Sequence, residues 1–201
     1  MTKTIYVATT NPGKINEFNE MLSPLNLNVK SLKDEVPQMD DVEETGETFR
    51  DNAILKAETY AERYQLPILA DDSGLEVDAL NGEPGVYSAR YAGEAKNDEA
   101  NIDKVLHQLE NVSESNRDAA FVCVIAFAEP NSTTLTSEGK CAGSITDKRY
   151  GEHGFGYDPI FKPDGYDQTL AELGPEIKNT ISHRRHALNN MLTQLETVLG
   201  R

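Results

Sequence analysis

Short apolar runs alternate along this chain with segments whose apolar residues recur at helical spacing. The run Thr4–Ala8 is typical of a strand, and it is followed by Ile15, Phe18, Leu22 and Leu25, which stand three or four residues apart. The chain is therefore predicted to begin with a strand, a loop and a helix.

Three further segments carry the apolar stripe of an amphipathic helix. They are Thr48–Tyr64, Asp98–Leu109 and a last helix that begins near Ser182. The residues predicted to face inward are Phe49, Ala53, Ala57 and Tyr60 or Ala61 in the first, Ile102, Val105, Leu106 and Leu109 in the second, and Leu188, Met191, Leu192, Leu195, Val198 and Leu199 in the last.

The remaining apolar stretches are predicted to be strands. One begins at Pro67 and leads into a pair of aspartates, and Gly85–Tyr91 is predicted to be a strand or a strand end. Ala119–Ala128 is apolar almost throughout, and Thr133–Thr146 is predicted to pair with it as an antiparallel hairpin. Strands interleaved with helices, plus one hairpin, predict an α/β fold with a mixed sheet.

Composition limits the class of protein. With 201 residues, of which 38% are hydrophobic, the chain suits a single domain over residues 1–201. No apolar stretch approaches the roughly 18 residues of a membrane helix, and the first apolar run is too short for a signal peptide. We therefore expect a soluble protein of the cytoplasm. Cys123 and Cys141 lack ligand-like neighbours at metal spacing and are interpreted as structural thiols.

The formal net charge of −15 argues against a protein that binds nucleic-acid polymers, because such binding needs clustered lysines and arginines. A small phosphorylated ligand remains compatible with this charge. It requires positive groups that converge locally, with a divalent cation to offset the remaining repulsion.

The loop Thr9–Lys14 is a candidate phosphate site. A helix that opens directly after a strand presents unpaired backbone N–H groups and a positive dipole end. Asn11 is a favoured N-cap, Pro12 suits the first helical position, and Lys14 adds a further donor. The loop lacks the spacing of a Walker motif. The alternative is a well-capped helix with Lys14 in solvent, paired with Glu17 on the surface.

Asp71 and Asp72 stand side by side in the sequence ADDSG. Adjacent strand residues point to opposite faces of a sheet, so the two carboxylates cannot both be exposed to solvent on one face. Together with Glu43 or Glu44 they would supply hard oxygen ligands suited to Mg²⁺, which usually takes only one or two carboxylates. The alternative is that Asp71 caps a turn and the glutamates belong to a solvated acidic face.

Two further segments have unusual chemistry. Ser182–His186 places cationic residues at a helix start, where the helix dipole disfavours them. His183 and Arg184 are the stronger candidates for function, since Arg185 and His186 are also compatible with a surface position. Gly154–Pro159 holds two aromatic rings among glycines, which suits stacking on a base. The alternative for this turn is a purely structural role in lining the core.

Taken together, these segments resemble the inosine/xanthosine triphosphate pyrophosphatase family, also called the Ham1-like family. The resemblance spans nearly the whole chain. The matching segments, in family order, are Thr9–Lys14 with Glu17, Glu43–Gly46, Asn52-Ala53-x-x-Lys56-Ala57, ADDSGLEVDAL, Pro84–Gly93, Gly154–Pro159 and Ser182-His183-Arg184.

The resemblance implies a Mg²⁺-dependent enzyme that hydrolyses ITP, dITP or XTP to the monophosphate and pyrophosphate. It also implies a homodimer whose elongated mixed sheet, with flanking helices, forms two lobes around a central cleft. Asp72 would be the proton acceptor and a metal ligand, with Glu43 as the second metal ligand. The implied substrate-binding residues are Thr9, Thr10, Asn11, Pro12, Gly13 and Lys14 around the triphosphate, Lys56 and Ser73, then Phe155, Gly156, Tyr157 and Asp158 around the base, and Lys178, His183 and Arg184, which complete its recognition.

Three questions stay open at this point. A carboxylate bound directly to Mg²⁺ is a poorer base, so Asp72 is unsuited to both roles at once, and Asp71 is the spare. A pyrophosphatase for other modified nucleotides would share these motifs. A non-catalytic purine-nucleotide binding module would keep the loop and the aromatic turn but would not need Asp72 and Glu43.

Overall fold

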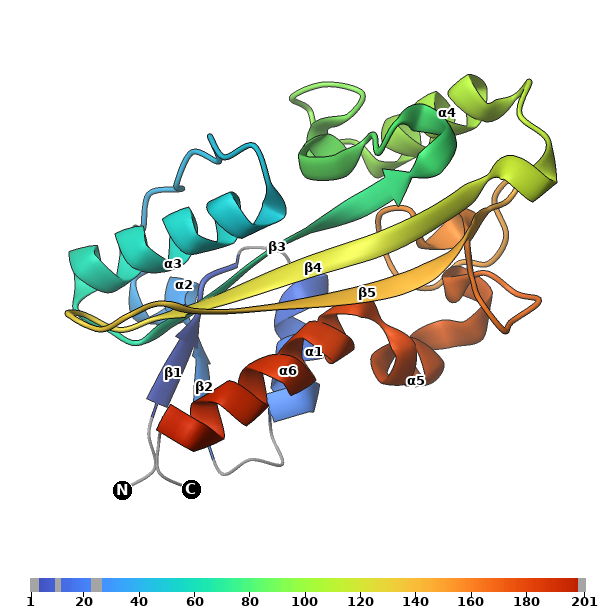
Figure 1. The fold of residues 1–201 in the computed structure, drawn as a ribbon. Coiled ribbons are helices and arrows are strands. Elements are labelled where there is room, and N and C mark those ends of the chain that lie inside the picture. Colours follow the sequence, from blue (N-terminus) through green and yellow to red (C-terminus); the bar gives the residue numbers. More distant parts are fainter. Residues whose placement is uncertain (1–3, 10–11, 23–26, 199–201) are drawn as a thin grey trace. The chain divides into compact units, whose positions relative to one another are not determined.

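The computed structural model describes residues 4–9, 12–22 and 27–198 (Figure 1). The strands are β1 (Thr4–Val7), β2 (Asn28–Ser31), β3 (Ile68–Val77), β4 (Asp118–Ala128), β5 (Leu135–Ile145) and β6 (Phe161–Pro163). The α-helices are α1 (Pro12–Leu22), α2 (Leu32–Glu35), α3 (Phe49–Tyr64), α4 (Asp98–Leu109), α5 (Leu170–Ile181) and α6 (His183–Val198). Short 3₁₀ helices are η2 (Asp78–Leu80), η3 (Gly85–Arg90), η4 (Glu114–Asn116) and η5 (Asp158–Ile160).

The strands form a six-stranded mixed sheet with the order β2-β1-β3-β4-β5-β6. β1 runs parallel to β2 and to β3, and β5 runs antiparallel to β6. β4 and β5 are neighbours joined only by residues 129–134, a connection too short for a parallel crossover. They therefore form the predicted antiparallel hairpin, and the predicted α/β class with a mixed sheet is confirmed.

The chain divides into two compact units. The first consists of Met1–Asp72, Cys123–Glu138 and Ala187–Arg201, and the second of Ser73–Val122 and Gly139–His186. β3, β4 and β5 each contribute residues to both units. The single domain and the cleft between two lobes stay predictions.

The core of the first unit is built by strands β1, β3 and β4 with helices α1 and α6. Its buried side chains are Ile5, Val7, Phe18, Leu22, Leu69, Cys123, Ile125, Phe127, Ala187, Leu188, Met191 and Leu195. α3 begins as predicted, because the Thr48 hydroxyl accepts a hydrogen bond from the Asp51 N–H at 3.1 Å and caps the helix. The predicted stripe from Phe49 to Ala61 is its buried face.

The second unit has its own core, in which α4 packs against β3, β4 and β5. Its buried side chains include Leu75, Val77, Tyr91, Ile102, Val105, Leu109, Phe121, Ile145, Tyr157, Ile160, Phe161 and Leu170. α5 opens with a capping box between Thr169 and Glu172, and its helical geometry is interrupted at Gly174, which precedes Pro175. This helix was not predicted, because the break hides its periodicity.

Two predictions of local structure are wrong. Gly85–Arg90 is a 3₁₀ helix rather than a strand, held by the Ser88 hydroxyl, which donates to the Gly85 carbonyl at 2.6 Å and accepts from the Leu75 N–H at 2.9 Å. β3, which carries ADDSG, runs on beyond this sequence to Val77. Asp71 lies in the middle of β3, so the alternative that it caps a turn is wrong.

None of the helices in the described ranges is both long and apolar enough to cross a membrane. Cys123 and Cys141 are free thiols, and both are buried. Burial raises the pKa of the Cys141 thiol to about 11. This agrees with the structural role predicted for the two cysteines.

Candidate active site

Asp71 and Asp72 are both buried, with exposed fractions of 1% and 6%. Their position in β3 explains how two adjacent acidic residues come to be enclosed, since their side chains leave the strand on opposite faces. Buried carboxylates are costly unless they are paired or hydrogen-bonded. Their partners in the first unit therefore define the site.

Lys14 on α1 reaches Asp71, with 2.9 Å between its Nζ and the Asp71 Oδ2. Its side chain is only 18% exposed, and Glu17 on the same helix is buried as well. The alternative of a surface pair between Lys14 and Glu17 in solvent is therefore wrong.

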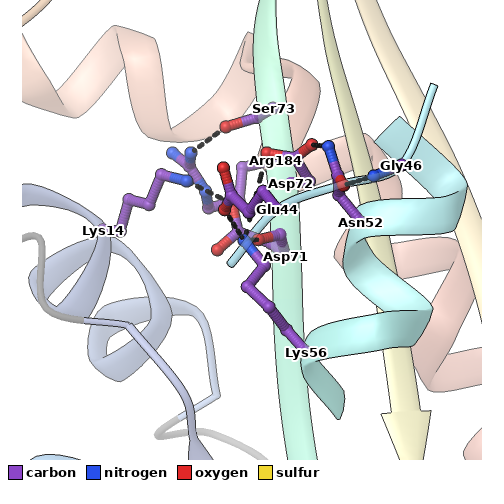
Figure 2. Close-up of polar contacts among 9 residues, drawn as sticks. All are labelled: Lys14, Glu44, Gly46, Asn52, Lys56, Asp71, Asp72, Ser73 and Arg184. Carbon is purple, nitrogen blue, oxygen red and sulfur yellow. Dashed lines mark hydrogen bonds and ion pairs between the residues drawn. The ribbon is translucent and has the colours of Figure 1, made fainter. Parts of the chain in front are cut away.

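A second lysine, Lys56 on α3, joins three acidic residues. Its Nζ donates to the Glu44 Oε1 at 2.7 Å and to the Asp71 carbonyl at 2.6 Å, and it lies 4.0 Å from the Asp72 Oδ1. Figure 2 shows the Lys14 and Lys56 side chains approaching the aspartates from different helices. We call Lys14, Glu44, Lys56, Asp71 and Asp72 the acid–lysine cluster.

The electrostatics of this cluster are unbalanced. Counted over its own five residues, the cluster has three carboxylates and two ammonium groups, an excess of one negative charge. Burial raises the pKa of Asp72 above its ordinary value, and the Glu44 carboxylate raises it further, while Lys56 opposes the rise. For Lys56, burial alone would lower the pKa, but the neighbouring carboxylates outweigh it and raise the pKa. The cluster is therefore suited to gaining positive charge.

The structure distinguishes the two glutamates that the sequence left open. Glu44 is half-buried and bonded to Lys56, whereas Glu43 is exposed, and within the described residues its side chain makes no hydrogen bond or ion pair. The resemblance implied Glu43 as the metal ligand, and that role stays a prediction. Among the described residues, no group of three or more His, Cys, Asp or Glu side chains is arranged to hold a metal ion.

The predicted phosphate loop is described only in part. Thr10 and Asn11 lie outside the described residues. Thr9 is half-buried after β1, and α1 begins at Pro12, followed by Gly13, which agrees with the predicted helix start. The described end of this loop lies beside the acid–lysine cluster, because Lys14 belongs to both.

The second unit contains a different charged arrangement around the aromatic turn. The Lys178 Nζ donates to the Asp158 Oδ2 at 2.6 Å, and both side chains are buried. The same oxygen accepts the Phe155 N–H at 3.0 Å, and the Lys178 Nζ lies 4.2 Å from the centre of the Phe155 ring. A side chain at Gly154 would place its Cβ 2.0 Å from the Asp158 Oδ2, so the close approach requires glycine.

The two aromatic residues of the turn have different roles. Tyr157 is buried in the core of the second unit, and its hydroxyl donates to the Ser88 carbonyl at 2.7 Å, which supports the structural alternative for this ring. Phe155 is half-buried, and the Gly156 N–H donates to the Asp98 Oδ2 at 2.9 Å. Phe155 is therefore the ring that remains suited to stacking.

The start of α6 agrees with the prediction made from its cationic sequence. The Ser182 hydroxyl accepts the Arg185 N–H at 3.1 Å and caps the helix. The His183 ring stacks on Phe121, with 4.9 Å between ring centres, and the Arg184 Nη2 donates to the Ser73 Oγ at 3.1 Å (Figure 2).

His183 and Arg184 are buried, whereas Arg185 is half-buried and His186 is exposed. This division is the one that the sequence analysis favoured. Burying the Arg184 guanidinium at a helix start is unfavourable for folding, and local rules of this kind are often broken at functional sites.

Sequence reasoning did not assign a role to Asn52, which is fully buried on α3 and donates to the Asp72 Oδ2 at 3.0 Å. It was noted only as part of a motif. Its spacing was a usable signal, because residues four apart on a helix share a face, and Asn52 precedes Lys56 by four.

Comparisons with known proteins show the family of this chain. The model of the Ham1 family matches residues 5–194. The chain is 50% identical to the dITP/XTP pyrophosphatase of Oceanobacillus iheyensis, over 98% of this chain and 100% of that protein. It is 53% identical to the dITP/XTP pyrophosphatase of Halalkalibacterium halodurans, over 92% of this chain and 95% of that protein.

A solved structure has the same fold. The Ham1 protein of Staphylococcus aureus superposes with a TM-score of 0.87 at 50% identity, covering 97% of this chain and 99% of that one. The match extends through both units and includes the strand that carries the paired aspartates. The chain belongs to the Ham1 family.

Proposed function

We propose that this protein hydrolyses the deaminated purine nucleoside triphosphates ITP, dITP and XTP to the monophosphate and pyrophosphate. The observation that carries the proposal is the acid–lysine cluster, in which two lysines and three carboxylates are gathered around one strand. Relatives about half identical to this chain are named dITP/XTP pyrophosphatases, which supports the substrate class.

In this proposal the first unit binds the triphosphate and performs the chemistry. Lys14 and Lys56 neutralise phosphate charge as the pyrophosphate leaves, and the loop Thr9–Lys14 adds donors to the phosphate oxygens. Asp72 accepts the proton of the attacking water. Its raised pKa makes it a stronger proton acceptor than an ordinary aspartate, whereas Asp71 is engaged by the Lys14 ammonium at 2.9 Å.

We propose Mg²⁺ as the cofactor. The fit rests on the donor set, because hard carboxylate oxygens are the ligands Mg²⁺ prefers and the cluster has an excess of negative charge. The resemblance implies Asp72 and Glu43 as ligands. Because a carboxylate bound directly to Mg²⁺ is a poorer base, the proposal keeps Asp72 as the proton acceptor and Glu43 as the direct ligand. Glu44 is the glutamate that lies beside Lys56. When bound, the ion would neutralise phosphate charge and orient the phosphates.

In the second unit, the proposed role is recognition of the base. Phe155 would stack on the purine, and Lys178, His183 and Arg184 would present donors to its 6-oxygen. Adenine carries an amino group at that position and would leave a buried donor unpaired, which can give rejection of about 10⁴-fold. Ser73, bonded to Arg184, is proposed to contact the substrate as well.

A steady-state assay tests the function. ITP, dITP, XTP, GTP and ATP are each supplied with and without Mg²⁺, and pyrophosphate and orthophosphate are measured separately. We expect pyrophosphate mainly from the first three nucleotides, with ATP and GTP as poor substrates, and only with Mg²⁺. Release of orthophosphate would reject the proposed bond cleavage, and preference for another modified nucleotide would favour the related pyrophosphatase.

We further propose a homodimer in the cytoplasm. The dimer is supported by family resemblance, and light scattering on the purified protein would measure the mass directly. A mass of 22.2 kDa, that of one chain, would reject the dimer.

A further inference from the structure

Asn52 is a fully buried amide that bonds to two different parts of the first unit. Its Nδ2 donates to the Asp72 Oδ2 at 3.0 Å, and its Oδ1 accepts the Gly46 N–H at 2.7 Å. Figure 2 shows the amide between the Asp72 carboxylate and the backbone of Gly46. Neither bond takes part in the proposed chemistry, so the position of Asn52 requires an explanation of its own.

The bond to Gly46 sets the direction of the amide. A backbone N–H can only donate, so the oxygen of Asn52 must face Gly46 and its amino group must face Asp72. The Asp72 carboxylate is then held between this amino group at its Oδ2 and the Lys56 ammonium 4.0 Å from its Oδ1. The directed hydrogen bond from Asn52, together with the nearby Lys56 charge, restricts rotation of the carboxylate.

The contact with Gly46 is close enough to exclude any side chain at that residue. A Cβ on Gly46 would lie 2.6 Å from the Asn52 Oδ1 and 2.9 Å from the Asn52 backbone nitrogen. Gly46 is two residues from Glu44, whose carboxylate bonds to Lys56 at 2.7 Å. The segment that carries Glu44 is therefore attached to α3 at two points, through Asn52 and through Lys56.

We propose that Asn52 is a positioning residue for the hydrolysis: it fixes the orientation of the Asp72 carboxylate and couples it to the segment that carries Glu44. The inference rests on the proposed function. It accounts for an amide at this position, because a carboxylate would repel Asp72 and an aliphatic side chain would leave both Asp72 and Gly46 without this partner. Partners of this kind around a reactive carboxylate typically change activity by about 10- to 100-fold.

The test compares Asn52→Ala with Asn101→Ala. Asn101 is a matched control, since it is also buried on a helix and also bridges two groups, accepting the Ala92 N–H at 2.7 Å and donating to the Ala89 carbonyl at 3.2 Å. Both of its partners are backbone groups outside the proposed site. The measurements are kcat and KM for ITP, and the affinity for an ITP analogue with a methylene bridge between the α and β phosphorus atoms, by calorimetry.

We expect Asn52→Ala to lower kcat by about 10- to 100-fold while KM and analogue affinity change by less than about threefold. Asn101→Ala should leave kcat within about twofold at a temperature where both variants are folded. If Asn52→Ala does not fold, Asn52→Ser is the second variant: it adds no charge, its side chain is too short to reach both Asp72 and Gly46, and it should lower kcat in the same way.

Three results would overturn the inference. The first is an unchanged kcat in the Asn52 variants, the second an equal loss of kcat in Asn101→Ala, and the third a loss of analogue affinity as large as the loss of kcat. These outcomes are distinct from failure of the proposed function, in which the unmodified protein releases no pyrophosphate from ITP, dITP or XTP. That result would reject both proposals.

Discussion

The two units of the molecule handle buried charge in opposite ways. In the second unit, one carboxylate, Asp158, pairs with one ammonium group, Lys178, at 2.6 Å. The Phe155 N–H also donates to Asp158. In the first unit, the acid–lysine cluster gathers three carboxylates around two lysines, and the pKa of Asp72 is raised by burial. Counted over these residues alone, the pair has equal numbers of acidic and basic groups, whereas the cluster has one more acidic group than basic groups.

The difference indicates what each arrangement is for. A balanced buried pair is strongly damaged by the loss of one member, because the other is left as an uncompensated charge. In a cluster with more carboxylates than lysines, the carboxylates repel one another. Neutralising one of them therefore reduces this repulsion and favours folding, but it also removes a group that the proposed chemistry uses. Stability and activity should therefore respond in opposite directions in the first unit and in the same direction in the second.

The largest expected effect is on turnover in the first unit. Asp72→Asn should lower kcat for ITP by about 10²- to 10⁴-fold, because the proposed proton acceptor is lost. Affinity for the methylene-bridged ITP analogue should be retained, as measured by calorimetry. Retained binding with lost turnover excludes the non-catalytic binding module, and a variant that turns over normally would remove Asp72 from the chemistry.

In the second unit, Asp158→Asn should lower the free energy of unfolding by about 3–5 kcal/mol, because Lys178 is left buried without its countercharge. Urea denaturation measures the change. The double variant Asp158→Asn/Lys178→Met should recover part of this loss, since no charge remains buried. If the double variant is less stable than Asp158→Asn, the pair is not the balanced unit described above.

The matched change in the first unit should be much milder. Glu44→Gln should change the free energy of unfolding by no more than about 1 kcal/mol, because the Glu44–Lys56 pair is partly exposed and the repulsion with Asp72 is relieved. The same urea series, run beside Asp158→Asn, makes the comparison. Equal losses in the two variants would show that the two units do not differ in this respect.

The smallest effect concerns pH. Because the pKa of Asp72 is higher in the folded protein than in the unfolded chain, the folded state binds its proton more tightly. Stability of the metal-free protein should therefore fall as pH rises from the ordinary aspartate range through the raised pKa. Asp72→Asn lacks this group. Across the same pH window, the free energy of unfolding of the variant should therefore rise relative to that of the unmodified protein.

Urea midpoints at a series of pH values, without Mg²⁺, measure that difference. A difference in urea midpoint between Asp72→Asn and the unmodified protein that does not vary with pH would contradict the raised pKa of Asp72. The same comparison is repeated in proteins that also carry Glu44→Gln. Because the Glu44 carboxylate raises the pKa of Asp72, its removal should reduce the pH dependence of the difference in midpoint.

Local signals in the sequence predicted several elements of this fold. The stripe from Phe49 to Ala61 identified α3, and Ser182 identified the start of α6. Such features depend on residues within a few positions of one another. For the same reason the division between His183 and Arg184, which are buried, and the following two residues could be predicted.

What the sequence did not predict depends on distant contacts or on broken patterns. α5, which carries Lys178, was missed because Gly174 and Pro175 interrupt its periodicity. The partnership of Lys14 with Asp71 joins residues far apart in the chain, so local spacing favoured Glu17 instead. β2, α2 and β6 are three or four residues long, too short to give a periodic signal.

The two buried thiols have a practical consequence for labelling. Cys123 is fully enclosed, and the pKa of Cys141 is raised to about 11, so at neutral pH neither presents an accessible thiolate to alkylating reagents. A cysteine introduced at an exposed position should thus react first with a maleimide dye while the natural pair is retained. Fluorophores or spin labels can be attached to this protein at chosen sites without first preparing a cysteine-free background.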